Sequence, residues 1–327
     1  MQNKNYNAQT IVEAGLTTAL IVVIMLACIY IPIFSIFINF ILPIPIAILY
    51  IRQDYKITII SVVASGIFIA MLVNPITALS SIVLVGLSGM TFGYCVKNKK
   101  KFGTTILMLT VAIIIGEIVY FSVYIGIISN KGIYEFVNDF FVKPFKEGMS
   151  QNKIIYSKMG ISNAQLSYME SIEAQITPQY IMRIIPSMMV LASVFIAYLN
   201  YLIGSAVLKR LNYDVMDVKP FNEIYISTRV GTAVAIVLLI GVILNRRNME
   251  LGYYFMNSSK NLLQFIFMVD GLALASYYLK NKFNMSNKVI VLILILTVFY
   301  YFIYDILGFA DMLIDFRKLD PYRAQKK

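Results

Sequence analysis

The chain has 327 residues, of which 59% are hydrophobic and 14% are charged, with a mean hydropathy of +0.75 and a formal net charge of +11. A soluble domain has roughly 45–50% apolar and about 25% charged residues, so this composition excludes an ordinary soluble fold and indicates lipid as the solvent. The chain contains no histidine, which excludes histidine-based acid–base catalysis and histidine-ligated metals. The basic residues lie between apolar runs, which favours lipid headgroups over nucleic acid as their partner.

The opening hairpin sets the pattern for the chain. Its first apolar run, Ile11–Tyr30, holds a single acid, Glu13, and has about the length that a helix needs to cross a hydrocarbon layer of roughly 30 Å. A second run, Phe34–Ile51, contains two prolines and ends at the charged segment Arg52–Lys56. We therefore expect two membrane crossings joined by a short turn.

Further apolar runs of similar length follow, and together with the first two they predict nine crossings. The seventh run is short and would cross only with help from its flanking residues. The fold class is thus all-α, a polytopic helical membrane protein with nine transmembrane helices, eight being the alternative. The remaining runs are Ile57–Val73, Ile76–Val96, Thr104–Ile128, Ile181–Leu208, Val230–Leu244, Leu262–Leu279 and Val289–Leu307.

One long polar excursion, Ser129–Tyr180, separates the fifth and sixth runs. Apolar residues recur at helical spacing in its first part and predict a short amphipathic helix that stops at Pro144. Ser162 is placed to cap a second short helix.

The distribution of Lys and Arg predicts the orientation. With nine crossings, fourteen basic residues lie on the N-terminal side, against Arg246, Arg247 and Lys260 in the short loops opposite. Cytoplasmic loops carry the excess of Lys and Arg, so we expect the bacterial cytoplasmic membrane, a cytoplasmic N-terminus and an external excursion. The basic tail after Asp315 would then lie outside, so either the tail is an exception or one of the last three runs fails to span.

Several short segments, in this order, resemble the YybS family of uncharacterised bacterial membrane proteins. Together they cover nearly the whole chain, and their order carries more specificity than any one of them. They are Glu13–Leu16, Ile31-Pro32, Leu42–Pro45, Leu199–Leu202, Val207–Arg210, Pro220-Phe221, Gly271–Leu274, Tyr277-Tyr278 and Asp315–Lys318.

More remotely, the first six runs resemble the substrate-binding S component of energy-coupling-factor importers. That resemblance implies a six-helix membrane domain over residues 1–210, including the 129–180 excursion, with a solute pocket opening outward. Residues 211–327 would be additional membrane helices and a basic tail. The resemblance also implies a coupling subunit and an ATPase pair as partners, docked through small residues four apart. Ala14/Thr18 and Gly15/Ala19 have that spacing without forming the strict alanine pair of the family.

Two acids lie deep in apolar runs, Glu117 in the fifth and Asp270 in the eighth. An ionisable group at that depth is costly and usually faces protein or water, so both are candidate solute-binding residues. The alternative interpretation is a protonated carboxyl that hydrogen-bonds to a neighbouring helix. Asn39 and Asn200 are weaker candidates, because intramembrane amides more often join helices.

Other features favour structural roles. Gly89 and Gly93 form a G-x-x-x-G spacing that predicts internal helix packing rather than dimerisation. Asp311 and Asp315 near the end are expected to pair with Arg317 or Lys318 at the membrane surface.

The sequence has no phosphate-binding glycine loop and no catalytic motif, so we expect no enzyme, no cofactor and no metal site. Two functions stay open. One is a solute-binding component like the S subunit, with an unknown small-molecule substrate. The other is a non-transporting membrane scaffold that recruits envelope or cytoplasmic partners.

Overall fold

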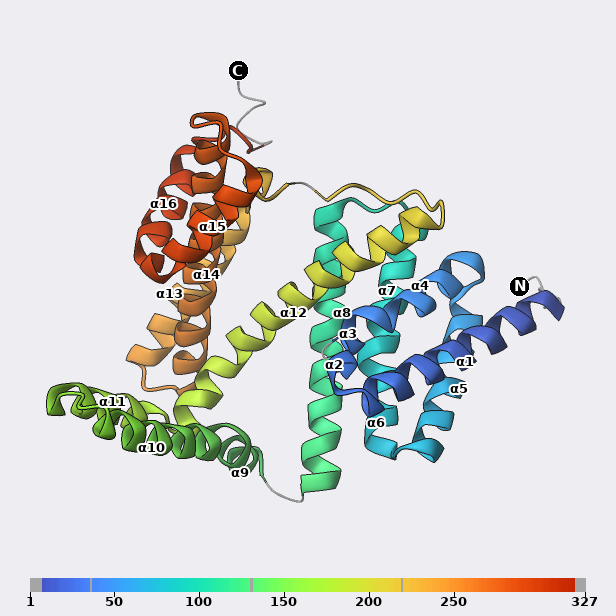
Figure 1. Ribbon diagram of the computed structural model, residues 1–327, viewed down its shortest axis with the longest axis horizontal. Coiled ribbons are helices and arrows are strands. Elements are labelled where there is room, and N and C mark those ends of the chain that lie inside the picture. Colours follow the sequence, from blue (N-terminus) through green and yellow to red (C-terminus); the bar gives the residue numbers. More distant parts are fainter. Residues whose placement is uncertain (1–7, 36, 130–131, 219, 321–327) are drawn as a thin grey trace. The chain divides into compact units, whose positions relative to one another are not determined.

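The computed structural model describes residues 8–35, 37–129, 132–218 and 220–320, and within those ranges it contains helices and no strand (Figure 1). The chain divides into two compact units. Unit 1 comprises residues 1–136 and 189–218, and unit 2 comprises residues 137–188 and 219–327. The boundary expected at residue 210 lies close to the end of unit 1 at Val218, whereas most of the 129–180 excursion groups with the C-terminal helices in unit 2.

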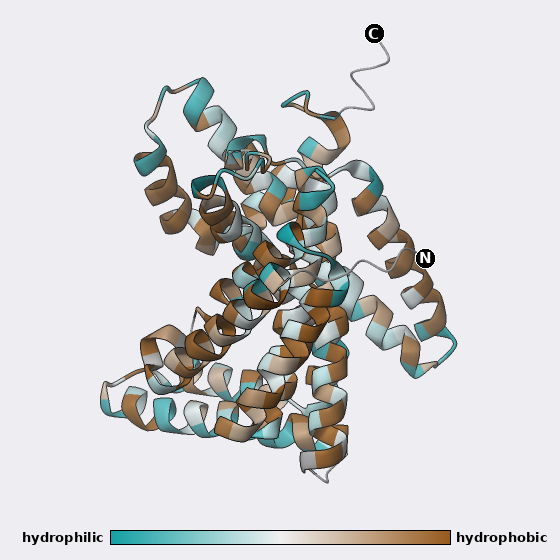
Figure 2. Cartoon of the chain, turned by 90° about the vertical axis from the view of Figure 1, so that its right-hand side faces the viewer, coloured by the Kyte–Doolittle hydropathy of each residue, from teal (hydrophilic) through white to brown (hydrophobic). Residues whose placement is uncertain are grey.

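Eight helical segments of the described chain are long and apolar enough to cross a membrane, and hydrophobic residues are frequent along the helices (Figure 2). A helix is the expected form, because every backbone polar group must be satisfied within the segment when lipid is the solvent. The all-α, multi-pass membrane class is therefore confirmed. The segments are Ala8–Tyr30, Tyr55–Leu72, Pro75–Lys97, Phe102–Ile127, Pro178–Arg210, Thr228–Arg246, Glu250–Asn281 and Asn287–Ile314.

The second apolar run departs from a continuous helix. It forms α2 (Pro32–Ser35), α3 (Ile38–Ile41) and α4 (Pro43–Arg52), and α4 has a proline in its first turn, where the missing N–H leaves no hydrogen bond broken. The run still brings the chain back to where α1 (Ala8–Tyr30) begins. There the Gln53 side-chain amide donates to the Glu13 carboxylate over 2.7 Å. The broken run thus completes the opening hairpin.

The glycine spacing of the fourth run is explained by close packing inside unit 1. This run forms α6 (Pro75–Ser80), a π-helical turn and α7 (Gly86–Lys97). A Cβ on Gly89 would lie 2.8 Å from the carbonyl oxygen of Pro43, and one on Gly93 would lie 2.9 Å from that of Ala47. The prediction that these glycines serve internal packing is confirmed, since α7 lies directly against the backbone of α4.

Polar contacts gather the ends of the unit 1 helices on one side. Lys97, at the end of α7, donates to the carbonyl oxygens of Tyr50 and Gln53 at the end of α4. After α8 (Phe102–Val123) and α12 (Pro178–Arg210), the chain returns to the same place, where Lys99 pairs with Asp214 over 2.9 Å. Unit 1 therefore makes six passes, and both of its ends lie on the side where α1 begins.

The excursion is more helical than expected. Helical structure runs from α9 (Ile133–Val137) through a π-helical segment into α10 (Lys143–Lys158), so Pro144 does not stop a helix. The wider π turn precedes the proline, which then occupies the first turn of α10 and breaks no hydrogen bond. The expected cap at Ser162 is confirmed, because it forms a capping box with Gln165 at the start of α11 (Asn163–Gln175).

The C-terminal helices of unit 2 pack around two close crossings. α13 (Thr228–Arg246) and α14 (Glu250–Asn281) are antiparallel, and Gly241 and Gly252 allow each backbone to approach the other helix. α16 (Tyr301–Ile314) crosses α14 where Gly308 faces the carbonyl oxygen of Phe267. Small residues at such crossings permit the backbone contact that stabilises membrane helices.

The ninth apolar run is a helical hairpin and not one straight helix. α15 (Asn287–Thr297) follows α14 after a short turn, a 3-10 turn interrupts the run at Val298–Tyr300, and α16 leads back (Figure 1). The Thr228 hydroxyl at the start of α13 donates to the carbonyl oxygen of Met312 near the end of α16. Both ends of the hairpin therefore lie on the side of unit 2 where α13 begins and α14 ends. Together with the six passes of unit 1, α13 and α14 make eight, a set that includes the broken second run and leaves out the hairpin, so the path of the chain agrees with the eight crossings that the sequence left open as an alternative.

Candidate functional site

Three of the sequence candidates line one cavity in unit 1. Asn39 on α3, Glu117 on α8 and Asn200 on α12 meet there, together with Ser88 on α7. They come from four different passes, so the cavity lies in the middle of the bundle. Glu117 lies fifteen residues beyond Phe102, about 23 Å along α8 at 1.5 Å per residue, and Ser88 lies nine residues before Lys97, so the cavity is near the middle of these helices.

The polar groups of this cavity are incompletely paired. The Ser193 hydroxyl donates to Oε2 of Glu117 over 3.2 Å. Both side-chain polar atoms of Asn200 lack a hydrogen-bond partner among the described residues, although only 3% of this residue is exposed. An unpaired buried amide is costly, typically about 1–3 kcal/mol, so these atoms are free to bind something that enters the cavity.

The cavity is small. Its volume is about 40 Å³, enough for a water molecule, which needs roughly 10–15 Å³ of such space, or for an ion. Pockets for drug-sized ligands measure roughly 300–1,000 Å³. In this conformation the cavity therefore admits only water, an ion or a small polar group.

Asp270, the fourth candidate, belongs to unit 2 and has a different environment. Its Oδ1 accepts from Arg317 over 2.5 Å, and Oδ2 of Asp311 accepts from the same guanidinium over 2.8 Å. Arg317 also donates to the carbonyl oxygens of Ile224 and Asn222. The side chains of both ion pairs are fully buried.

This buried network differs from the sequence expectation. Pairing of Asp311 with Arg317 was expected, but at the membrane surface and without Asp270. One guanidinium faces two carboxylates, and one oxygen of each, Oδ2 of Asp270 and Oδ1 of Asp311, has no partner in the described structure. With both carboxyl groups ionised, the network would have one more negative than positive charge. The sequence marked the two partners separately, Asp270 as an acid inside an apolar run and Arg317 as part of a basic tail that the nine-crossing topology put outside, but no pattern joined them.

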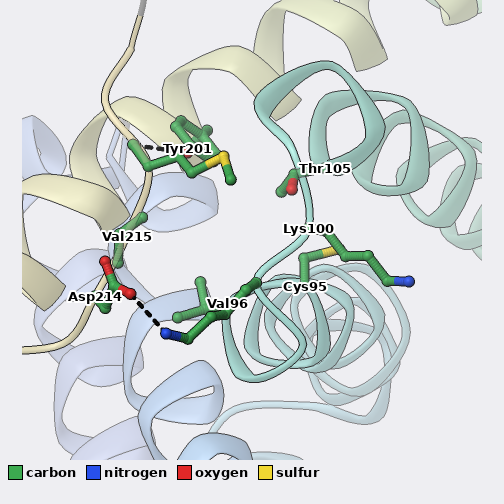
Figure 3. Close-up of a pocket in the computed structure, with 9 residues that line it drawn as sticks. Cys95, Val96, Lys100, Thr105, Tyr201, Asp214 and Val215 are labelled. Atoms are coloured by element: carbon green, nitrogen blue, oxygen red, sulfur yellow. Dashed lines mark hydrogen bonds and ion pairs between the residues drawn. The ribbon is translucent and has the colours of Figure 1, made fainter.

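A second, more polar pocket lies at the basic end of unit 1 and has a volume of about 80 Å³. Figure 3 shows Tyr201, Asp214 and Val215 facing Cys95 and Thr105 across it, with the Lys100 side chain pointing away. Lys99, which also lines this pocket, is already paired with Asp214.

Ionisable groups outside the spans have shifted pKa values with simple causes. A hydrogen bond from Lys153 on α10 to Glu173 on α11, 2.6 Å long, raises the pKa of the Lys153 ammonium. Burial raises the pKa of Tyr225, whose hydroxyl lies 3.3 Å from Asp320. Within the described residues, no group of three or more Cys, Asp or Glu side chains has the arrangement of a metal site.

Comparisons with known proteins agree with the resemblance found in the sequence. Residues 19–312 match the family described as "Predicted membrane protein (DUF2232)". The chain is 23% identical over 291 residues to the "Uncharacterized protein YybS" of Bacillus subtilis (strain 168), and the alignment covers 88% of this chain and 90% of that protein. No solved structure matches the chain.

Proposed function

The chain belongs to the DUF2232 family of predicted membrane proteins, and from this premise we propose that unit 1 is a solute-binding component that resembles the S subunit of energy-coupling-factor importers. Neither the family description nor the name of the relative assigns an activity. The proposal therefore rests on the site. Its main support is the convergence of Asn39, Glu117 and Asn200 on one cavity.

The chemistry of the cavity favours a small solute with a positive charge or several hydrogen-bond donors. Glu117 supplies a carboxylate, and Asn39 and Asn200 supply amides that both donate and accept. Asn39 lies on α3, a helix of only four residues between two breaks. A larger solute would enter by displacement of this short segment, since α8 and α12 are long and continuous.

Orientation and docking extend the proposal. The positive-inside rule puts the Lys97–Lys99 end in the cytoplasm, and the resemblance to S components implies that the cavity opens toward the outside. On α1, Ala14 packs through its carbonyl oxygen against Ser61, whereas nothing lies within 4 Å of a Cβ added at Gly15. The Gly15/Ala19 face is therefore open to a coupling subunit, which would bring the ATPase pair that this sequence lacks.

A ligand screen tests the proposal. Purified full-length protein is heated with vitamins, amines and metal ions, and ligands are identified by a shift in melting temperature. Glu117→Gln should weaken a detected ligand by about 10–100-fold, because a hydrogen bond to a charged group contributes about 1.5–3 kcal/mol. Glu13→Gln, an acid at the other end of unit 1, is the matched control and should leave affinity unchanged. Equal affinity of the Glu117 variant and the wild type would reject this site.

A second candidate function, a non-transporting scaffold, is favoured by the surface of the α10–α11 pair. Large apolar side chains are exposed there, including Ile154, Ile155, Met159 and Tyr168, each more than half exposed. Such a patch suits contact with a partner or with the membrane surface. Co-purification separates the two functions: an ATPase pair with a coupling subunit supports the first, and a cell-envelope complex supports the second. If the first function is correct, Gly15→Leu should block docking of the coupling subunit and abolish recovery of the ATPase pair.

A further inference from the structure

The largest cavity among those described lies in unit 2, inside the C-terminal hairpin. It has a volume of about 550 Å³ and is lined by α14, α15 and α16, with Leu274, Tyr278, Ile293 and Leu307 among its walls. Of the hydroxyls among its walls, those of Thr297 and Tyr304 lie 2.5 Å apart and bond to each other. The surface left to an occupant is therefore almost entirely hydrocarbon.

The shape of the hairpin explains the cavity. α16 packs tightly on α14 at Gly271 and Gly308, whereas in α15, all of whose residues are described, only Ile290 is buried. α15 consequently stands away from α14 and leaves a space between the three helices. The side chains around an empty cavity of this kind lose van der Waals contacts unless an apolar group fills it. The cavity also has too few polar groups to hold ordered water.

Positive charge lies at one end of this cavity. Tyr278 and Leu279 line it at the end of α14, and the next residues form the turn to α15 with Lys280, Lys282 and Lys288. The sequence has no acidic residue between Asp270 and Asp305 to neutralise them. Phe316 also lines the cavity and is followed two residues later by Lys318, which is exposed. Basic pockets between membrane helices are suited to anionic lipid headgroups.

We propose that this cavity is a binding site for an anionic phospholipid, with one acyl chain between α14, α15 and α16 and the phosphate at Lys280 and Lys288. The acyl chain matches the hydrocarbon walls, and the phosphate matches the unneutralised lysines. The bound chain takes the place of the contacts that α15 does not make with α14. This site is separate from the cavity of unit 1, so it does not depend on the proposed solute function.

Lipid selectivity tests the proposal. Full-length protein in nanodiscs of defined composition is analysed by native mass spectrometry, with phosphatidylglycerol and phosphatidylcholine of identical acyl chains in competition. The wild type should retain phosphatidylglycerol preferentially. The double substitution Lys280→Gln and Lys288→Gln should reduce that preference by roughly thirty-fold, since each lysine near an anionic surface contributes a factor of about five. The matched control, Arg246→Gln with Arg247→Gln on the opposite turn of unit 2, should leave it unchanged. Equal retention of the two lipids by the wild type, or equal losses in the two double variants, would overturn the site.

The acyl chain is tested separately. Ala275→Phe narrows the cavity and should lower retention of both lipids. As a test that needs no variant, phosphatidylglycerol with a photoreactive acyl chain should label the wild type at Tyr278, Tyr304 or Leu307. Labelling confined to other helices contradicts the proposal. sn-Glycerol 3-phosphate, which has the phosphate but no acyl chain, serves as a competitor of phosphatidylglycerol. If it competes as well as the intact lipid does, the site binds phosphate and not lipid, and the proposal is wrong.

Discussion

Arg317 is the residue with the greatest concentration of buried charge around it. Its guanidinium holds Asp270 and Asp311 and two backbone carbonyl oxygens, with no exposed side-chain surface in either ion pair. A planar guanidinium suits several acceptors at once, which an ammonium group does not. The end of α16, the segment Asn222–Ile224 that precedes α13, and α14 at Asp270 are therefore held together by one side chain.

We expect Arg317→Met to destabilise unit 2 by about 3–5 kcal/mol, because it leaves two carboxylates buried without a positive charge. The measurement is unfolding of the full chain in detergent micelles, followed by circular dichroism. Lys318→Met, at the exposed neighbouring residue, should have little effect. Equal stability of the two variants would mean that the network contributes nothing.

A triple variant separates two causes of destabilisation in Arg317→Met: the loss of the hydrogen bonds of Arg317, and the burial of carboxylates without a positive charge. Arg317→Met combined with Asp270→Asn and Asp311→Asn removes all three charges, so the triple variant should be more stable than Arg317→Met alone. The same unfolding assay measures it. A triple variant that is less stable than the single one would show that the hydrogen bonds, and not the charge imbalance, dominate.

Sequence reasoning at the residue scale found the unusual groups but not all their partners. Glu117 and Asp270 stood out because an acid deep in an apolar run is costly. Nothing in the sequence linked Asp270 to Arg317, which is 47 residues away and follows the last apolar run. Likewise, the meeting of Asn39 with Glu117 depends on the bend at α3, whose geometry no local pattern fixes.

At the scale of elements, the contact between α4 and α7 depends on Gly93. A Cβ there would lie 2.7 Å from the Cβ of Tyr50 and 2.9 Å from the Ala47 carbonyl oxygen, which cannot move without displacing α4. Gly93→Ala should therefore lower the free energy of unfolding by about 1–3 kcal/mol. Gly103→Ala, where a Cβ meets nothing within 4 Å, should be neutral or slightly stabilising. Thermal unfolding of both variants checks this, and a harmless Gly93→Ala would refute the close packing.

The α10–α11 pair is held by Lys153, which contacts Glu170 at 3.7 Å and Glu173 at 2.6 Å. Because the pKa of Lys153 is raised, the contribution of its charge is complete below the pKa of the unfolded chain and is lost only as the pH rises through the higher folded value. We expect Lys153→Gln to increase hydrogen exchange in α11 at pH 7. In the wild type, the loss of the Lys153 charge should increase this exchange at strongly alkaline pH, and the variant should not show that further increase. Lys146→Gln on the same helix is the control, and identical exchange in both variants would exclude this role.

The breaks in the apolar runs were predictable to different degrees. Prolines mark the break in the second run, as their missing N–H requires. The break at Val298–Tyr300 has neither Pro nor Gly, and the run has the length of a straight crossing. Periodicity could not reveal it, because both arms of the hairpin are apolar on nearly every face.

For the whole molecule, the hairpin bears on the conflict over the basic tail, of which residues 321–327 lie outside the described residues. Since both hairpin ends lie where α13 begins, Lys318 and the lysine-rich turn before α15 share one side of unit 2, as the positive-inside rule favours. The native cysteines, Cys28 and Cys95, are buried, so single introduced cysteines report accessibility. We expect Ser286→Cys and Lys318→Cys to be labelled from one side of oriented membranes and Ser157→Cys from the other. If Lys318→Cys and Ser157→Cys are labelled from the same side, the chain has nine crossings and not eight.

Composition and run length were enough to predict the class of the molecule, because lipid allows few backbone structures other than helices. The division into units was not predictable. It depends on contacts such as that of Ser258 on α14 with the Arg183 carbonyl oxygen on α12, which join the excursion side of the chain to the C-terminal helices.

The buried pair of Asp270 and Arg317 also has a consequence for biosynthesis. The ribosome releases Arg317 forty-seven residues after Asp270, when α13 and α14 have already reached the translocon. Until then the acid has no cation, and a polypeptide that terminates early never acquires one. Nascent chains that end before residue 317 should accordingly be recognised by membrane quality-control proteases, and pulse-chase turnover of a chain ending at residue 315 compared with one ending at residue 320 would measure it.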